Sequence, residues 1–280
     1  MITNAPKIDI IHAQGLNAGI IGIALKFIFR KRFIISLHAV YANINKNGFS
    51  GFATRLILNN AAVVLGMSKA VINQFAQYGI KKNLLNEYRY WVDTEHFKPM
   101  DLKEARKNLN IEDRFTVLFV GRLITIKGIK LLVEVAKELK HLQFLFVGTG
   151  PLEDFLKSAS KQFSNIHFLG KVQNTDLPIY YNSADLLCIP SLYEEALGRV
   201  TLEAVACGIP VVGSNKGGIL EVMTKEISVL VQPTQKILKE TISKLSKNQS
   251  ELKILKGNCR PHALKFFSKD SIKLITKHYL

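Results

Sequence analysis

The nine residues EALGRVTLE run from Glu195 to Glu203 and are followed by the apolar residues AVAC and by GIPVV at Gly208 to Val212. This order of residue types predicts a loop, a helix, a glycine that ends the helix and a buried strand. Glu195 would then lie in the loop that enters the helix, and Glu203 on the helix itself. Strands and helices alternate along the rest of the chain, which predicts an α/β fold with parallel sheets.

The same nine residues carry groups suited to a particular ligand. The N-terminus of a helix offers free N–H groups and a partial positive charge, which suit a phosphate. Two carboxylates beside it can accept hydrogen bonds from paired hydroxyls. A ligand with both groups, such as a nucleotide sugar, would fit this stretch. The alternative is an amphipathic helix with two solvated glutamates.

A second segment points to the same kind of ligand. The apolar run FTVLFV ends at Val120 and is followed by GRLITIKG, from Gly121 to Gly128. The turn at the carboxyl end of a parallel strand is where α/β folds bind ligands. Arg122 and Lys127 in this turn could neutralise a diphosphate, the arginine as a fork and the lysine as a point charge. The alternative is that both are surface charges on a loop.

Further motifs follow in a fixed order. They are FVGTGPL at 146–152, IHFLG at 166–170, YYNSAD at 180–185 and SNKGGILE at 214–221. Together with the two segments above, they resemble the retaining glycosyltransferases of family 4, the group 1 class. The resemblance implies the GT-B fold, which has two Rossmann-like domains with parallel sheets. It implies an acceptor-side domain over residues 1–98, a nucleotide-sugar-binding domain over 99–266, and a terminal helix over 267–280 that packs back on the first domain.

The resemblance also implies roles for single residues. Arg122 and Lys127 match the pair that holds the donor diphosphate and stabilises charge on the leaving group, work done elsewhere by a metal. Glu203 matches the ligand of the ribose hydroxyls, Glu195 lies near the donor sugar, and His38 reaches the site from the first domain. The donor-binding residues further include Gly121, Ala196, Leu197 and Gly198. No D-x-D pair is present in the sequence, so we expect neither a metal nor a cofactor.

The implied activity is transfer of a hexose-type sugar, with retention, from a nucleotide-sugar donor to a hydroxyl acceptor such as a glycan, a lipid-linked sugar or lipopolysaccharide. Two alternatives remain open. One is another GT-B enzyme, such as a nucleotide-sugar epimerase, against which the E-x7-E and G-R-L-x-x-x-K-G motifs argue. The other is a truncated, inactive remnant that binds nucleotide or a partner subunit.

The N-terminal part favours the second alternative. The resemblance begins at KIDIIHAQG, from Lys7 to Gly15, which in relatives lies well inside the first domain. We therefore expect an N-terminally truncated first domain with an incomplete sheet and an unpaired strand edge. The helix expected over Asn17–Phe29 is apolar on more than one face. This predicts an exposed apolar patch and either self-association or a partner chain.

The charge of the 280-residue chain, +16 with a pI near 9.7, is compatible with several anionic partners. No zinc-ligand spacing or aromatic RNA-binding signature accompanies it, so we expect no nucleic acid. Lys26 and the run Arg30–Arg32 flank phenylalanines, which predicts either an element lying on an anionic membrane surface or an ordinary crossover helix with a basic end. We expect a cytoplasmic protein, either free or peripheral at the inner face of the membrane.

Overall fold

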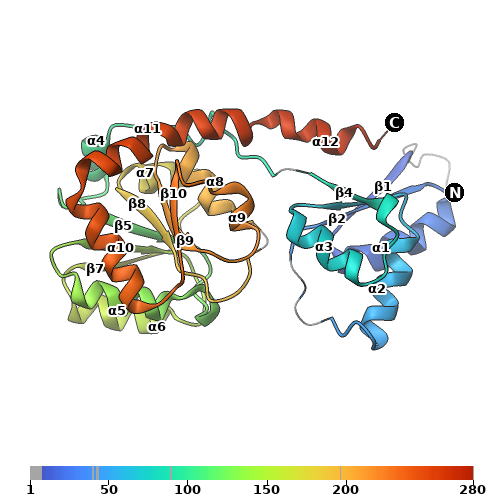
Figure 1. Cartoon of the computed structure of the whole chain (residues 1–280), viewed down its shortest axis with the longest axis horizontal. Coiled ribbons are helices and arrows are strands. Elements are labelled where there is room, and N and C mark those ends of the chain that lie inside the picture. Colours follow the sequence, from blue (N-terminus) through green and yellow to red (C-terminus); the bar gives the residue numbers. More distant parts are fainter. Residues whose placement is uncertain (1–7, 40, 42–43, 89, 196, 280) are drawn as a thin grey trace, which may run out of the picture. The chain divides into compact units, whose positions relative to one another are not determined.

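The computed structural model describes residues 8–39, 41, 44–88, 90–195 and 197–279. They form two compact units (Figure 1). The N-terminal unit runs to Tyr90 and includes Glu195–Leu197 and Asp270–Leu280. The C-terminal unit comprises Trp91–Glu194 and Gly198–Lys269. Each unit is built on one parallel sheet, so the predicted α/β class is confirmed.

The sheet of the N-terminal unit has its strands in chain order, β1-β2-β3-β4. Right-handed connections between strands in this order place the crossover helices on one face of the sheet. The strands are β1 (Ile10–Gln14), β2 (Arg32–Leu37), β3 (Val63–Gly66) and β4 (Leu85–Glu87), and the connecting helices are α1 (Leu16–Phe29), α2 (Phe49–Asn59) and α3 (Lys69–Gln77), with the 3-10 turn η1 (Lys82–Leu84) before β4.

Helix α3 begins and ends where its sequence predicts. The Ser68 hydroxyl accepts a hydrogen bond from the backbone N–H of Val71, at 3.3 Å, and so caps the first turn. Gly79 follows the helix with φ of 80°, a left-handed conformation that favours glycine. Ser68 and Gly79 thus account for the two ends of α3.

Helix α1 packs on β2 through glycines. A Cβ atom on Gly19 would lie 2.6 Å from the side chain of Ile35, and one on Gly22 would lie 2.4 Å from the ring of Phe33. The helix axis therefore approaches the sheet more closely than larger residues would allow. Large apolar side chains of α1 remain on the solvent side, among them Phe27 and Ile28. The predicted exposed apolar patch is thus present.

The sheet of the C-terminal unit has the order β10-β9-β8-β5-β6-β7, with all strands parallel. Every residue of β5, β6, β8 and β9 is buried, as expected for a parallel sheet covered on both faces. The strands are β5 (Thr116–Val120), β6 (Gln143–Val147), β7 (Ile166–Gly170), β8 (Leu186–Ile189), β9 (Val211–Ser214) and β10 (Ser228–Val231).

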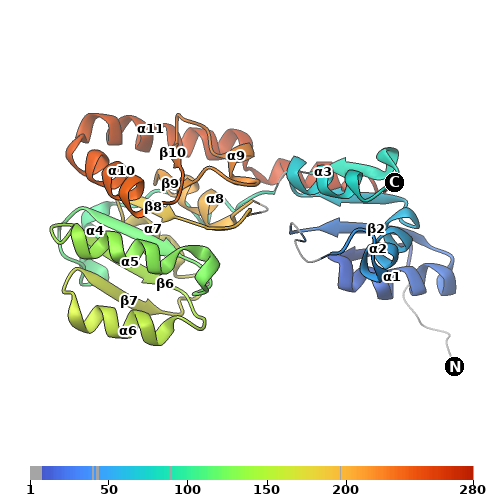
Figure 2. The ribbon, with the colours of Figure 1, turned by 60° about the horizontal axis from the view of Figure 1, so that its bottom comes forward.

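Helices cover both faces of this sheet (Figure 2). The strand order runs from β5 through β6 to β7 in one direction and from β8 through β9 to β10 in the other, so right-handed crossovers place α5 and α8 on opposite faces. Helix α10 packs against α5, and α11 against α8. The helices are α4 (Leu102–Asn108), α5 (Ile129–Glu138), α6 (Glu153–Gln162), α7 (Leu177–Asn182), α8 (Arg199–Ala206), α9 (Ile219–Val222), α10 (Gln235–Lys247) and α11 (Gln249–Phe266), with the 3-10 turn η2 (Thr125–Lys127) before α5.

The segment after α11 differs from the single terminal helix expected over 267–280. It consists of a 3-10 turn, η3 (Lys269–Ile272), and a short helix, α12 (Lys273–Thr276). Ser268, Asp270 and Ser271 lie at this break. Their short polar side chains compete for backbone hydrogen bonds and favour caps and turns over helix interiors.

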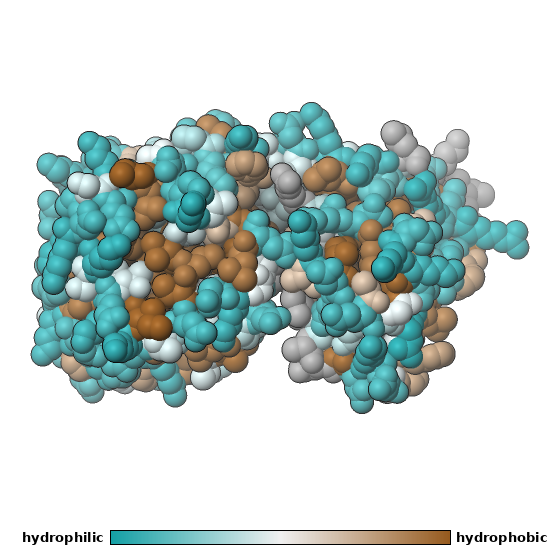
Figure 3. Space-filling model, viewed as in Figure 1, coloured by the Kyte–Doolittle hydropathy of each residue, from teal (hydrophilic) through white to brown (hydrophobic). Residues whose placement is uncertain are grey.

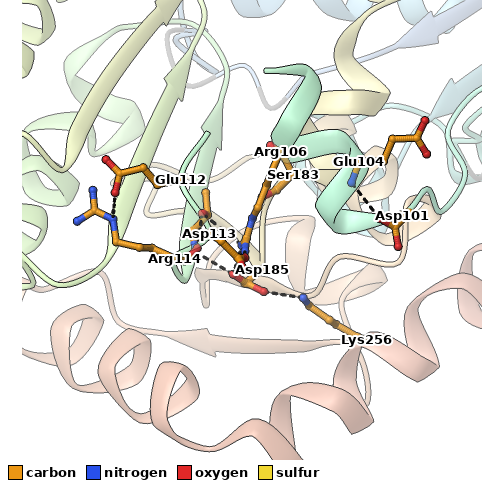
Figure 4. A network of polar contacts seen from close by, with 10 residues as sticks. Asp101, Glu104, Arg106, Glu112, Asp113, Arg114, Ser183, Asp185 and Lys256 are labelled. Carbon is orange, nitrogen blue, oxygen red and sulfur yellow. Dashed lines mark hydrogen bonds and ion pairs between the residues drawn. The ribbon is translucent and has the colours of Figure 1, made fainter. Parts of the chain in front are cut away.

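A buried ionic network joins four segments of the C-terminal unit (Figure 4). Asp185, at the start of β8, accepts hydrogen bonds from Arg106 Nη2 at 2.7 Å and from Lys256 Nζ at 2.8 Å. Its carboxylate also accepts the backbone N–H of Thr116, at 2.9 Å. Arg106 reaches Asp113 with its other terminal nitrogen, at 2.6 Å. The network therefore holds α4 and α11 to the first residue of β5.

We expect Asp185→Ala to lower the free energy of unfolding by about 3–5 kcal/mol, because it leaves the buried Arg106 guanidinium without its carboxylate. Asp113→Ala is the matched control: it removes another carboxylate from the same arginine, but the Asp113 side chain is 76% exposed. That variant should cost less than about 1 kcal/mol. Urea denaturation followed by circular dichroism measures both. Equal losses in the two variants would contradict this account of the network.

Candidate functional site

The strand order of the C-terminal unit marks one place for a ligand. The chain leaves β5 toward β6 on one side, whereas β8 pairs with β5 on the other side. In open α/β sheets, ligands bind at such a switch point, outside the carboxyl ends of the strands. The loop Gly121–Gly128 leaves β5 there, and the loop from Pro190 to Gly198 leaves β8. Within this unit, the two loops and the adjoining α8 carry the predicted site residues Gly121, Arg122, Lys127, Gly198 and Glu203, whereas Glu195–Leu197 of the second loop are grouped with the N-terminal unit.

Glycines let these loops pack backbone to backbone. Gly128 has φ of 73°, and a Cβ atom there would lie 2.0 Å from the carbonyl oxygen of Pro190. Gly148, after β6, has φ of 143°, and its Cβ would lie 1.8 Å from the carbonyl oxygen of Gly121. Neither contact tolerates a side chain. The loops after β5, β6 and β8 are therefore held close together at one edge of the sheet.

A pocket of about 180 Å³ opens at this edge. Two of its lining residues are cationic, Arg122 after β5 and Lys171 after β7. Lys171 is not among the site residues that the sequence predicts, although its place directly after the carboxyl end of the parallel strand β7 is the kind of position that marks such sites. The full lining is Val120, Gly121, Arg122, Val147, Gly148, Thr149, Lys171, Val172 and Leu177.

Lys127 lies on the same loop as Arg122 but is not among the residues that line this pocket. It is the last residue of the 3-10 turn η2, and its Nζ lies 5.1 Å from the centre of the Tyr193 ring, a cation–π contact. Tyr193 belongs to the loop after β8. The contact therefore links the two loops of the switch point, and sequence reasoning did not identify Tyr193.

Glu203 is only 4% exposed and faces two partners. The Tyr181 hydroxyl, from α7, donates to Glu203 Oε2 at 2.8 Å, and Arg199 Nη2 lies 3.7 Å from Oε1. Burial raises the pKa of the Glu203 carboxyl, and the Tyr181 hydrogen bond and the Arg199 charge oppose that rise. Burial beside this carboxylate also raises the pKa of Tyr181. Tyr181 stands in the YYNSAD motif, which was its only sequence signal.

The other predicted residues of this segment are placed as follows. Glu195 is buried in the loop before α8, and Leu197 is buried beside it. Gly198 is the N-cap of α8, with φ of 77°. Ala196 lies outside the described residues. The expectation that Glu195 precedes the helix and Glu203 lies on it is confirmed.

His38 belongs to the N-terminal unit, where it directly follows β2. Its Nε2 lies 2.6 Å from Gln14 Oε1, and its Nδ1 lies 2.8 Å from the Tyr88 hydroxyl. An amide oxygen only accepts, so Nε2 carries the proton and donates, and Nδ1 accepts from Tyr88. Burial lowers the pKa of His38, which favours this neutral form.

A second histidine, His12, extends this row of hydrogen bonds, since Gln14 lies between it and His38. The Nε2 of His12 lies 2.7 Å from the Ser36 hydroxyl, and its Nδ1 lies 2.7 Å from the hydroxyl of Tyr279. Burial lowers the pKa of His12, and the neighbouring His38 lowers it further. The lowered pKa values favour the neutral form of both imidazoles in this row.

Within the part of the chain that the structure describes, no group of three or more His, Cys, Asp or Glu side chains could hold a metal ion. None of the helices described there is long and apolar enough to cross a membrane.

We expect Glu203→Gln to stabilise the folded chain at neutral pH. Burial raises the pKa of this carboxyl, so the folded state binds its proton more tightly than the unfolded state, and stability falls as pH rises through that pKa. The variant should raise Tm by about 2–4 °C at pH 7.5 and lose this advantage near about pH 4. Glu240→Gln, at an exposed position of α10, should change Tm little at either pH. Differential scanning calorimetry with no gain for Glu203→Gln at pH 7.5 would contradict the cost assigned to this carboxylate.

Comparison with known proteins agrees with this geometry. Residues 101–261 match the family model described as "Glycosyl transferases group 1". An uncharacterized glycosyltransferase of Methanocaldococcus jannaschii is 28% identical over 245 residues, which cover 81% of this chain and 63% of that protein. The sulfoquinovosyl transferase of Arabidopsis thaliana is 29% identical over 234 residues, covering 79% of this chain and 45% of that protein. The chain thus spans less than two thirds of the length of these two relatives.

The fold has a match among solved structures. The Anabaena protein HepE, crystallised in complex with UDP, superimposes with a TM-score of 0.86 at 22% identity, over 97% of this chain and 78% of that protein. This likeness confirms the predicted GT-B fold. Because the family model covers more than half of the sequence and includes both loops of the switch point and α8, the chain belongs to the group 1 glycosyl transferases.

Proposed function

We propose that this chain binds a nucleoside diphosphate sugar at the switch point of the C-terminal unit and transfers the sugar to a hydroxyl acceptor. The observation that carries the proposal is the placing of Arg122 and Lys127 on one glycine-rich loop at that edge, with Arg122 lining the pocket. Two relatives support the ligand class. HepE was crystallised with UDP and with UDP-glucose, and the Arabidopsis relative is named a sulfoquinovosyl transferase.

In this proposal the cations hold the diphosphate. Arg122 offers a planar fork that matches two phosphate oxygens, and Lys127 adds a point charge. Lys171, which lines the same pocket, supplies a third positive charge within reach of an anionic ligand. In this proposal the three cations offset the negative charge of the diphosphate. Their contribution is electrostatic and requires no proton transfer.

Glu203 is the proposed ligand of the ribose hydroxyls. To accept hydrogen bonds from two hydroxyls it must be ionised, which burial disfavours. The Tyr181 hydrogen bond and the Arg199 guanidinium favour the ionised form. These two partners therefore keep a buried carboxylate available for a neutral polar ligand.

During transfer, the bond between the anomeric carbon and the diphosphate oxygen breaks, the acceptor oxygen bonds to that carbon, and the acceptor's proton passes to the departing diphosphate. Negative charge grows on the departing diphosphate, so Arg122 and Lys127 would stabilise the transition state more than the ground state. We place Glu195 beside the sugar and propose retention of the anomeric configuration, as in family 4. The role of His38, expected to reach the site from the first domain, stays a prediction, as do the acceptor classes, a glycan, a lipid-linked sugar or lipopolysaccharide.

We expect the chain to bind UDP, GDP or ADP, and Arg122→Ala and Lys127→Ala each to weaken that binding by about 1.5–3 kcal/mol, since each removes one charge-assisted contact. Lys107→Ala, which removes an exposed cation on α4, is the matched control and should leave affinity unchanged. Isothermal titration calorimetry on samples shown to be folded measures all three. A folded wild-type chain that binds none of the three nucleotides would refute the site.

We expect Glu195→Gln to spare nucleotide binding and to slow transfer, because the carboxylate faces the sugar and not the nucleotide. Glu203→Ala should instead weaken nucleotide binding itself. Calorimetry and the release of nucleoside diphosphate from UDP-, GDP- and ADP-sugars separate the two effects. Equal losses of nucleotide affinity would contradict this division. Nucleotide binding by wild type with no transfer to any acceptor would favour the alternative, a nucleotide-binding protein without catalysis.

A further inference from the structure

Helix α1 has an apolar solvent side. Ile20, Ile21, Phe27 and Ile28 are each between 60% and 70% exposed. Ile20 and Phe27, like Ile21 and Ile28, are seven residues apart, close to two helical turns, so the four side chains share one side of the helix. A helix on the surface of a globular domain normally carries polar residues on that side. We call these four residues, with Ala24 between them, the α1 stripe.

Packing on the sheet does not account for the α1 stripe. The side of α1 that faces β2 carries Gly19 and Gly22, which lie against Ile35 and Phe33. The buried residues of α1 are thus Leu16 and these two glycines, whereas the four large residues of the α1 stripe are exposed. A contiguous group of exposed apolar side chains is typical of an interaction site, whereas a single exposed apolar residue needs no explanation.

The neighbouring helix has the same character. Helix α2 exposes Phe49, Phe52 and Leu56, which follow one another at intervals of three and four residues. Helices α1 and α2 pack together, since Gly19 of α1 lies against Ile57 of α2. Figure 3 shows apolar side chains at the surface of this unit among hydrophilic ones. The apolar exposure therefore extends over two adjacent helices.

Charge identifies the kind of partner. Residues 8–86 contain a single acidic residue, Asp9. Arg30 and Lys31 follow the α1 stripe directly, and Arg32 opens β2. The other basic residues in this range are Lys26, Lys46, Arg55, Lys69, Lys81 and Lys82. An apolar surface with a basic border and almost no acid fits a partner that is apolar and anionic at once.

A second copy of the chain would not supply such a partner, because it would bring the same basic residues to the interface. An anionic bilayer does: phenylalanine and isoleucine can enter the boundary between headgroups and acyl chains, while Lys and Arg near the surface are attracted to the anionic headgroups. We propose that the α1 stripe docks on an anionic lipid surface, with α1 lying in its plane. At 14 residues the helix is shorter than the roughly 20 needed to span a membrane. The proposal does not depend on the proposed function.

The test is sedimentation of the full chain with vesicles. We expect it to pellet with vesicles of equal parts phosphatidylcholine and phosphatidylglycerol, and much less with phosphatidylcholine alone. The double variant Phe27→Ser with Ile28→Ser should lower the partition coefficient at least about tenfold, since two exposed apolar side chains no longer enter the bilayer. Arg30→Gln with Lys31→Gln should weaken binding several-fold and reduce its dependence on salt.

Matched controls use exposed residues of the C-terminal unit. Ile254→Ser with Leu264→Ser removes two exposed apolar side chains from α11, and Lys103→Gln with Lys107→Gln removes two cations from α4. Both controls should bind vesicles like wild type. All these positions are exposed or at the surface, and circular dichroism verifies that each variant is folded.

Three results would overturn the proposal. Wild type could remain in the supernatant with anionic vesicles, or the controls could lose as much binding as the α1 variants. Light scattering could show instead a dimer, without lipid, that Phe27→Ser with Ile28→Ser converts to monomer. That last outcome would assign the α1 stripe to a protein interface.

Discussion

The carboxylate of Asp185 is the constraint on which the C-terminal unit depends. Asp185 stands directly before β8, and its carboxylate accepts the first backbone N–H of β5. It therefore fixes the relative position of the first residues of β5 and β8, the two strands between which the strand order reverses. The backbone N–H of Asp185 returns a bond to the carbonyl of Thr116, at 2.8 Å. A shift between β5 and β8 would break these bonds inside a region that excludes water, where an unpaired charge is costly. The loops at the far ends of the same strands therefore start from a fixed relative position.

Close backbone packing also fixes the relative positions of the loops that form the candidate site. At Gly128 and Gly148 the neighbouring carbonyl oxygens occupy the space of a side chain, so the loops have little freedom to separate or slide. In the proposed function this loop presents Arg122 and Lys127 to a diphosphate, and such rigidity would favour binding because less conformational entropy is lost when the ligand binds. The tyrosine contact of Lys127 adds to it, since the ring lies on the loop after β8.

Prediction from the sequence worked best for features that depend on local backbone geometry. Glycines after apolar runs located the loops, and the paired glutamates located α8, because these patterns depend on local geometry alone. Lys171 and Tyr181 escaped prediction for the opposite reason. Each comes from a different strand or helix, and only the strand order brings Lys171 into the pocket of Arg122 and places Tyr181 against Glu203. The terminal segment was predicted as one helix because the pattern did not weigh Ser268 and Asp270, residue types that favour caps and turns over helix interiors.

The N-terminal unit shows how far a hydrophobic pattern alone can be taken. The α1 sequence reads as a buried helix because it is apolar nearly all round, yet its structure divides those residues by size. Two glycines and Leu16 are buried, whereas Ile20, Ile21, Phe27 and Ile28 face out. Periodicity cannot make this division, since Gly and Ile both fit an apolar pattern. The size difference has an energetic consequence. Because small residues occupy the packed side, Phe27 and Ile28 gain little hydrophobic or dispersion stabilisation within this unit. Burial of these two side chains against a second surface would supply that stabilisation, and the basic residues that follow the helix favour a surface that is anionic.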